Sequence, residues 1–255
     1  MSDETNLVLS VKIPLFEPSV PDGSSLVSAL NQNGFLGEVF HLRQERSTEL
    51  NLSVGSYEFL VKLHKTPIRS DVLESRCELS SWWPNAKNDL SRHTAFIEIV
   101  GNSPQRLNRV HESVAATYIS TEIVKLTKAA GVYWGDGILN SASDFIELAA
   151  VVRPQKLIAG LWVNVKAYRL DDGDFQLCTF GLDAFECADI EIPRFRSDSP
   201  GQVVASVCDV IERLLLGEIA LIDNQEIRWD NDQEVKVRYG RSFMNPHDCV
   251  AQFFF

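Results

Sequence analysis

Alternation of apolar and polar residues recurs along this chain and predicts many short β-strands. The strand-like segments are residues 7–16, 49–54, 57–63, 96–100, 161–170, 175–180, 188–192, 226–229, 234–239 and 250–255, and residues 131–137 are expected to form a short strand that leads into a turn. Three pairs of neighbouring segments flank short turn-forming stretches, namely Gly55-Ser56, residues 171–174 and residues 230–232. Strands joined by such short turns form antiparallel hairpins.

Apolar residues at spacings of three and four predict helices between these strands. The shorter helices are expected at residues 24–32, 70–79 and 145–151, and Ser141 stands in a capping position before the last of them. The longest helix is expected to begin at Ser103-Pro104 and to end at Gly131, with a wide apolar stripe that packs on a sheet. Another long helix follows residues 199–202, where Ser199 is the expected capping hydroxyl.

Strands outnumber helices, so the predicted class is α+β, with largely antiparallel sheets packed by two long amphipathic helices. The pattern fits one compact domain of residues 1–255. Both halves, however, show strands followed by a long helix. Two similar subdomains, 1–130 and 131–255, are therefore an alternative, although no sequence repeat marks them.

Two adjacent tryptophans, in Trp82-Trp83-Pro84, form the bulkiest apolar stretch of the chain, and a strand-like segment follows after His93. Each tryptophan buries about 150–250 Å² in a folded protein. We expect Trp82, Trp83 and His93 to be buried and structural, and we assign the same role to Trp134 and Trp162. The alternative for the pair is an exposed binding platform.

No motif specifies a catalytic, metal or cofactor site. The sequence has no phosphate loop, no serine nucleophile elbow and no zinc-protease motif. His247-x-Cys249 lacks the two further ligands that a zinc site needs. An unrecognised active site would have to lie around His93 and Asp136. The favoured interpretations are a hydrogen-bonded structural histidine and a glycine-flanked turn. We therefore expect a protein that is not an enzyme and binds no cofactor.

The cysteines and the apolar runs bear on the compartment. Five cysteines, an odd number, are scattered over the chain, which suits reduced thiols in a cytoplasm. The first residues are acidic and polar, unlike a secretory signal. No apolar run reaches the about 20 residues that a membrane helix needs. A cytoplasmic protein without a membrane span is expected.

Charge is concentrated in one segment. The net charge is −11, and residues 170–234 hold 16 acidic and 4 basic residues, so the rest of the chain sums to +1. This balance argues against nucleic acid as a direct ligand and favours a cationic protein partner. Hairpin tips are exposed, so the expected partner-binding carboxylates are Asp171, Asp172 and Asp174 at one tip, Asp230 and Asp232 at another, and Asp183 and Glu186 on an extension of the same surface. The alternative is that the acidity serves only solubility.

Several stretches together carry a family resemblance. They are residues 82–86, 93–95, 131–135, 161–163, 178–185 and 237–240. In this order, from about residue 62 to the C-terminus, they resemble an uncharacterised bacterial family, the domain of unknown function numbered four-two-six-one. The family has no established activity or catalytic residues, and its members resemble components of toxin–immunity neighbourhoods, including those of type VI secretion.

The resemblance implies a cytoplasmic immunity protein that binds and occludes a cognate cationic toxin, such as a nuclease. Two alternatives remain open at this point. One is an adaptor or chaperone that loads an effector for secretion, and the other is an enzyme with a site near His93 and Asp136.

Overall fold

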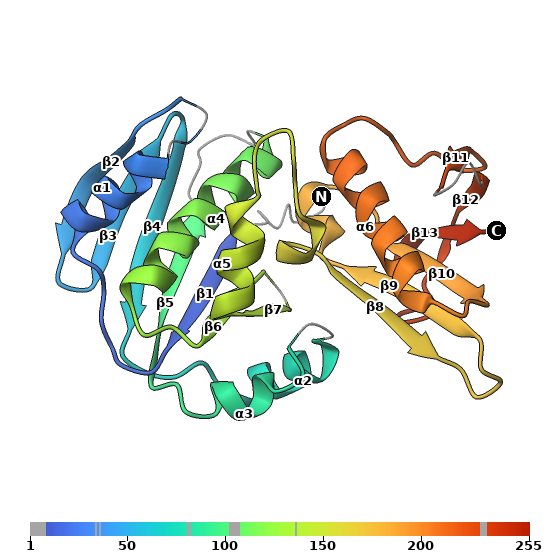
Figure 1. Ribbon diagram of the computed structural model, residues 1–255, viewed down its shortest axis with the longest axis horizontal. Helices are drawn as coiled ribbons and strands as arrows, with labels where there is room; N and C mark the ends of the chain where they lie inside the picture. The colour runs from blue at the N-terminus through green and yellow to red at the C-terminus, as the bar shows by residue number, and fades with distance from the viewer. Residues whose placement is uncertain are drawn as a thin grey trace. The chain divides into compact units, whose positions relative to one another are not determined.

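The computed structural model describes residues 9–33, 35, 37–80, 83–101, 108–135, 137–229 and 234–255. These residues form six α-helices and thirteen strands in two mostly antiparallel sheets, which confirms the predicted α+β class. The chain divides into two compact units, Met1–Pro154 and Gln155–Phe255, and each is described by itself (Figure 1).

The first unit is built on a seven-stranded sheet. Its strands are β1 (Ser10–Leu15), β2 (Phe40–Arg46), β3 (Glu49–Val54), β4 (Tyr57–His64), β5 (Ala95–Gly101), β6 (Gly131–Trp134) and β7 (Ile138–Ser141). The order across the sheet is β2-β3-β4-β5-β1-β6-β7, and every neighbouring pair is antiparallel. Alternate residues such as Ile13 and Ile97, which lie opposite each other, are fully buried.

Helices cover both faces of this sheet. α1 (Gly23–Asn33), α4 (Arg109–Leu126) and α5 (Ala142–Ala150) lie side by side over one face (Figure 1). α2 (Ser70–Leu79) and α3 (Ala86–Leu90) pack on the other face, against Tyr133 and Leu139 of β6 and β7. Tyr133 and the fully buried Ile13 belong to opposite faces, since Tyr133 pairs with Lys12 and residues alternate along a strand.

Helix α4 is buried on most of its circumference. Small residues, among them Ser113, Ala116 and Ser120, fall on one side of the helix and are all buried, which suits a close approach to the sheet. The carboxylate of Glu112 is also buried. A Cβ atom at Gly101 of β5 would lie 2.5 Å from Oε1 of Glu112, so the glycine makes room for it.

The second unit has a six-stranded sheet with one long helix. Its elements are the short 3₁₀ turns η1 (Ala159–Leu161) and η2 (Leu182–Phe185), the helix α6 (Pro200–Leu215), and the strands β8 (Asn164–Arg169), β9 (Phe175–Phe180), β10 (Ile190–Phe195), β11 (Glu226–Arg228), β12 (Glu234–Arg241) and β13 (Cys249–Phe254). The order is β11-β12-β13-β10-β9-β8, and only β10 and β13 among these pairs are parallel. Val207, Val210 and Ile211 form the buried side of α6.

The predicted hairpins β3–β4, β8–β9 and β11–β12 are all confirmed as antiparallel pairs. Helix α2 has the predicted bounds, and Ser141 accepts a hydrogen bond from the backbone of Asp144 at 3.2 Å, as a capping residue should. Strands β2 and β7 and helix α3 were not predicted. Most side chains of β2 are exposed, so the strand lacks an apolar alternation, and β7 and α3 are only four and five residues long.

Several element bounds and one helix cap differ from the sequence prediction. The described part of helix α4 begins at Arg109, where the Asn108 side chain caps two backbone amides, and it ends at Leu126; Ser103 and Pro104 lie outside the described residues. Helix α6 begins as predicted, but Ser199 makes no capping hydrogen bond. The two units meet at residues 154 and 155 rather than at 130 and 131, because β6 and β7 extend the first sheet.

Candidate functional site

The β8–β9 hairpin tip is partly neutralised by arginines. Asp171 and Asp172 are exposed, but Asp174 is only 7% exposed, which corrects the expectation that it reaches solvent. Nε of Arg196 donates to Asp174 Oδ1 at 2.9 Å, and Nε of Arg194 donates to Oδ2 at 2.7 Å. Arg194 also pairs with Asp172. Hydrogen bonds from Arg196 and Arg194 lower the pKa of Asp174. This carboxylate is therefore ionised and paired with arginines of its own chain.

The acidic segment does not form one continuous surface. Asp183 and Glu186 follow β9, whereas the 171–174 tip precedes it, so this six-residue strand of about 20 Å separates them. Asp183 and Glu186 therefore lie at the opposite end of β9 from the tip, and their part in a partner surface stays a prediction. Asp230 and Asp232 lie outside the described residues.

A second surface in this unit combines carboxylates with exposed apolar groups. Tyr239 near the end of β12 is 40% exposed, and the neighbouring Ile222 is 59% exposed. The Tyr239 hydroxyl donates to the backbone oxygen of Leu221 at 3.2 Å, and its backbone amide donates to Asp223 Oδ1 at 2.9 Å. The hydroxyl hydrogen bond thus orients an aromatic side chain that remains partly accessible, and the amide hydrogen bond ties its backbone to Asp223.

Two further exposed carboxylates directly precede cysteines that lie near Tyr239, and exposed Arg241 lies two residues beyond Tyr239 on the same face of β12. Burial raises the pKa of the Tyr239 phenol, and the nearby Cys187, Cys249 and Asp223 add to this effect. Exposed Glu186 directly precedes Cys187, and exposed Asp248 directly precedes Cys249. We call Glu186, Ile222, Asp223, Tyr239 and Asp248 the Tyr239 surface. The second unit holds 17 acidic and 10 basic residues, so its net charge is −7 and the surface lies in an acidic body.

A group of polar side chains, of which Cys178 and Glu191 are buried and Asp189 is half-buried, lies on the second sheet beside the loops of this surface. Cys178 of β9 pairs with Glu191 of β10, and Asp189 stands two residues before Glu191. Burial raises the pKa of Asp189 to about 6 and that of the Cys178 thiol to about 12, so the thiol stays protonated at neutral pH. Sequence reasoning missed these carboxylates. The alternation Asp189-Ile190-Glu191 was the available signal, since it places both on one face of a strand.

Trp83 belongs to the core of the first unit. Trp83 is 6% exposed, and its Nε1 donates to Asp89 Oδ2 at 2.9 Å. A Cβ atom at Gly131 would lie 2.5 Å from the Trp83 ring, which shows how closely the indole approaches β6. Trp134 and Trp162 are also buried, and Trp82 lies outside the described residues.

Both ring nitrogens of His93 are engaged. Nε2 accepts a hydrogen bond from the backbone amide of Ile68 at 2.8 Å, and Nδ1 donates to the backbone oxygen of Leu90. The buried imidazole therefore joins two segments of the chain, as a structural histidine does, and neither nitrogen is open to a substrate. Asp136, the other residue of the alternative enzyme site, lies outside the described residues.

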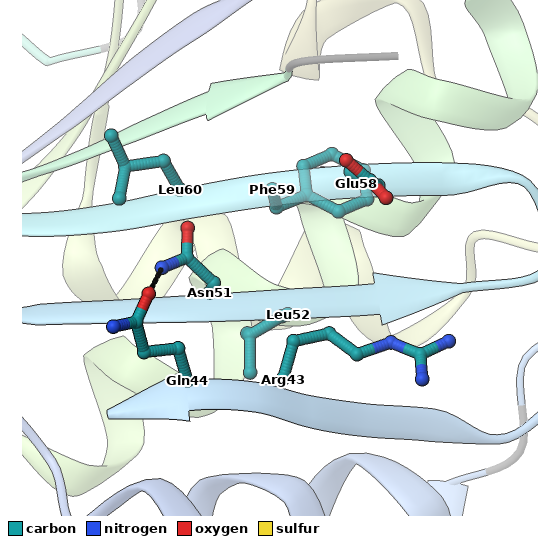
Figure 2. A pocket seen from close by; sticks show the side chains of 7 residues that line it. All are labelled: Arg43, Gln44, Asn51, Leu52, Glu58, Phe59 and Leu60. Carbon is teal, nitrogen blue, oxygen red and sulfur yellow. Dashed lines mark hydrogen bonds between the residues drawn. The ribbon is translucent and has the colours of Figure 1, made fainter. Parts of the chain in front are cut away.

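The outer face of the first sheet carries a hollow of about 310 Å³, lined by Arg43, Gln44, Asn51, Leu52, Glu58, Phe59 and Leu60 (Figure 2). Asn51 Nδ2 donates to Gln44 Oε1 on one side, and Nε of Arg43 donates to Ser53. Turned by 180°, the Gln44 amide oxygen accepts instead from Arg46. These lining side chains include no hydroxyl or thiol nucleophile.

Comparisons with models of protein families, with curated proteins and with solved structures find no match to this chain. Within the described residues, no group of three or more His, Cys, Asp and Glu side chains could hold a metal ion. None of the helices in the described part of the chain is long and apolar enough to cross a membrane. The protein is thus an α+β protein whose second unit is acidic and exposes an aromatic side chain. The family resemblance remains a prediction.

Proposed function

We propose that this protein is a non-catalytic binding module that recognises a basic protein partner through the Tyr239 surface. The observation that carries the proposal is the exposure of Tyr239 and Ile222 beside Glu186, Asp223 and Asp248. Protein interfaces commonly combine an aromatic anchor at the centre with a polar rim, and tyrosine is enriched among the residues that contribute most to binding.

The electrostatics of the second unit support the same proposal. A net charge of −7 attracts a cationic partner over long range and raises the rate of encounter, an effect that salt screens. The hydrogen bond from the Tyr239 hydroxyl to the backbone oxygen of Leu221 orients the anchor before binding. A side chain that is already ordered loses less conformational entropy in a complex.

We further propose that the partner is a bacterial toxin and that this protein acts as its immunity protein in the cytoplasm. The resemblance to the family numbered four-two-six-one supports this finer proposal. An acidic inhibitor also suits a nuclease toxin, whose active site has to attract phosphate groups. Inhibition by occlusion needs a complementary surface and no catalytic residue.

The test uses matched variants at the two ends of the second sheet. A basic candidate toxin is co-expressed with the wild type, with Tyr239→Ala, with the double variant Glu186→Gln/Asp248→Asn, and with the control Asp171→Asn. We expect Tyr239→Ala to weaken the complex by about 10- to 30-fold, as loss of a central anchor does. The double variant should slow association and reduce its dependence on salt, whereas Asp171→Asn should behave as the wild type.

Circular dichroism of each variant separates loss of binding from loss of folding. The proposal fails if the folded Tyr239→Ala and double variants bind and protect as well as the wild type. It also fails if Asp171→Asn weakens binding as much as they do, because the contact would then lie at the opposite end of the sheet.

A further inference from the structure

An irregularity of β2 brings two polar side chains to one hollow on the outer face of the first sheet. The pairing of β2 with β3 slips by one residue between Leu42 and Gln44, so Arg43 is an extra residue in β2. Such a β-bulge interrupts the alternation of side chains and redirects them. Arg43 and Gln44 therefore both line the hollow of about 310 Å³, which β3 and β4 complete (Figure 2).

The Arg43 guanidinium is held at one nitrogen and open at the other two. Its Nε donates to the Ser53 hydroxyl at 2.7 Å, and Ser53 is only 3% exposed. In the part of the chain that the structure describes, no carboxylate pairs with Arg43, and its terminal nitrogens donate to no protein group. A guanidinium fixed in this way presents a planar fork of N–H donors, which is the geometry that binds a carboxylate.

Glu58 supplies the opposite charge from the far side of β3. It lies opposite Ser53 in the β3–β4 ladder, so its exposed side chain stands on the same face. Among the described residues, no cation pairs with the Glu58 carboxylate. The backbones of β2 and β4 are two strand spacings apart, about 10 Å. Arg43 and Glu58 thus flank one strand, with a donor fork on one side and an acceptor on the other.

The other end of the hollow offers amide groups beside an apolar side chain. Figure 2 shows Gln44, Asn51 and Leu60 at this end, and Arg43 and Glu58 at the opposite end. Asn51 Nδ2 donates to Gln44 Oε1 at 3.4 Å. In either orientation of the Gln44 amide, the two carboxamides keep N–H donors and the Asn51 oxygen unused by described residues. This end therefore suits another carboxamide carried on a short apolar stem.

We propose that the hollow binds a free α-amino acid with a carboxamide side chain, whose carboxylate pairs with Arg43 and whose ammonium group pairs with Glu58. Two hydrogen bonds of about 2.8 Å, and the about 3 Å between the two charged groups on one α-carbon, fit the gap between β2 and β4. The side chain then runs along β3 to Asn51. This site lies on the first unit and is independent of the Tyr239 surface.

An NMR titration of the nitrogen-15-labelled full chain with L-glutamine tests the proposal. A ligand of about ten non-hydrogen atoms in a shallow hollow should bind with a Kd of about 1 mM. The shifted resonances should be the amides of β2, β3 and β4 and the Arg43 Nε–H. Two analogues each lack one charge: glutaramic acid has no ammonium group, and 4-aminobutanamide has no carboxylate. Each should bind about tenfold more weakly, because one charged hydrogen bond is lost.

Matched variants assign each charge to its partner. Arg43→Gln and Glu58→Gln should each weaken L-glutamine binding about tenfold. Arg43→Gln should bind L-glutamine and 4-aminobutanamide equally, and Glu58→Gln should bind L-glutamine and glutaramic acid equally, because the charge that differs has lost its partner. Lys62→Gln is the control, since Lys62 stands on the same face outside the hollow and pairs with Glu49 at 3.2 Å. It should bind as the wild type does.

Three results would overturn the proposal. The first is the absence of shifts in β2–β4 at about 10 mM L-glutamine, which is ten times the expected Kd. The second is equal binding of L-glutamine and both analogues by the wild type, a measurement that needs no variant to fold. The third is that Arg43→Gln and Glu58→Gln, shown by circular dichroism to be folded, bind L-glutamine no more weakly than Lys62→Gln.

Discussion

Replacement of Trp83 by alanine tests how the first unit is held together. The indole is 6% exposed and belongs to a cluster that joins α2 and α3 to the outer face of the sheet. An aromatic side chain of this kind buries roughly 200 Å², which corresponds to about 5 kcal/mol as an upper bound at 25 cal/mol per Å². Measured tryptophan-to-alanine changes in cores cost about 3–5 kcal/mol, and we expect a loss of stability in that range.

A series of variants separates the two contributions of this side chain. Trp83→Phe keeps most of the apolar ring and loses the hydrogen bond from Nε1 to Asp89. Asp89 is only partly buried, so water replaces the lost donor, and the expected cost is about 1–2 kcal/mol. Asp89→Ala removes the same hydrogen bond from the other side and should cost a similar amount, with little further loss when it is combined with Trp83→Phe.

Urea and thermal denaturation of the full chain provide the assay. For a unit of about 150 residues, a loss of 3–5 kcal/mol lowers Tm by about 6–20 °C. The two units can unfold separately, so hydrogen exchange assigns the transition to the first unit. A Trp83→Ala protein that stays within 1 kcal/mol of the wild type would refute the burial argument and return the tryptophan pair to the role of an exposed platform.

Three further predictions test the second unit and the helix ends. The pKa of Asp189 is raised to about 6 from 3.8, so the stability that this group contributes is full below pH 3.8 and is lost as the pH rises through 6. In urea denaturation, the free energy of unfolding of Asp189→Asn should exceed that of the wild type by about 2–3 kcal/mol at pH 8, with no gain at pH 4. In the same assay, Ser141→Ala should cost about 1 kcal/mol, whereas Ser199→Ala should have almost no effect, because only Ser141 caps its helix. In thermal denaturation, Asp174→Lys should lower Tm because it places a third cation beside Arg194 and Arg196, while Asp171→Lys should stay within about 0.5 kcal/mol of the wild type.

The class of the fold and its three hairpins are determined locally by this sequence. Alternation of apolar and polar residues acts between positions two apart, and turn residues such as Gly55, with a positive φ of 54°, act between adjacent strands. Both signals are complete within a stretch of about fifteen residues. The same holds for α2 and for the cap at Ser141, whose hydrogen bond reaches only three residues along the chain.

Contacts between distant segments were decided only by the tertiary structure. The placement of β1 between β5 and β6, and with it the boundary of the first unit, depends on strands more than 80 residues apart in the chain. The neutralisation of Asp174 depends on Arg194 in β10 and on Arg196 directly after it, and the separation of Asp183 from the hairpin tip depends on the direction of β9. Asp189 likewise looks like a solvated carboxylate in the sequence. Its raised pKa arises because packing against β9 and η2 removes water from the group, and no local pattern encodes that desolvation.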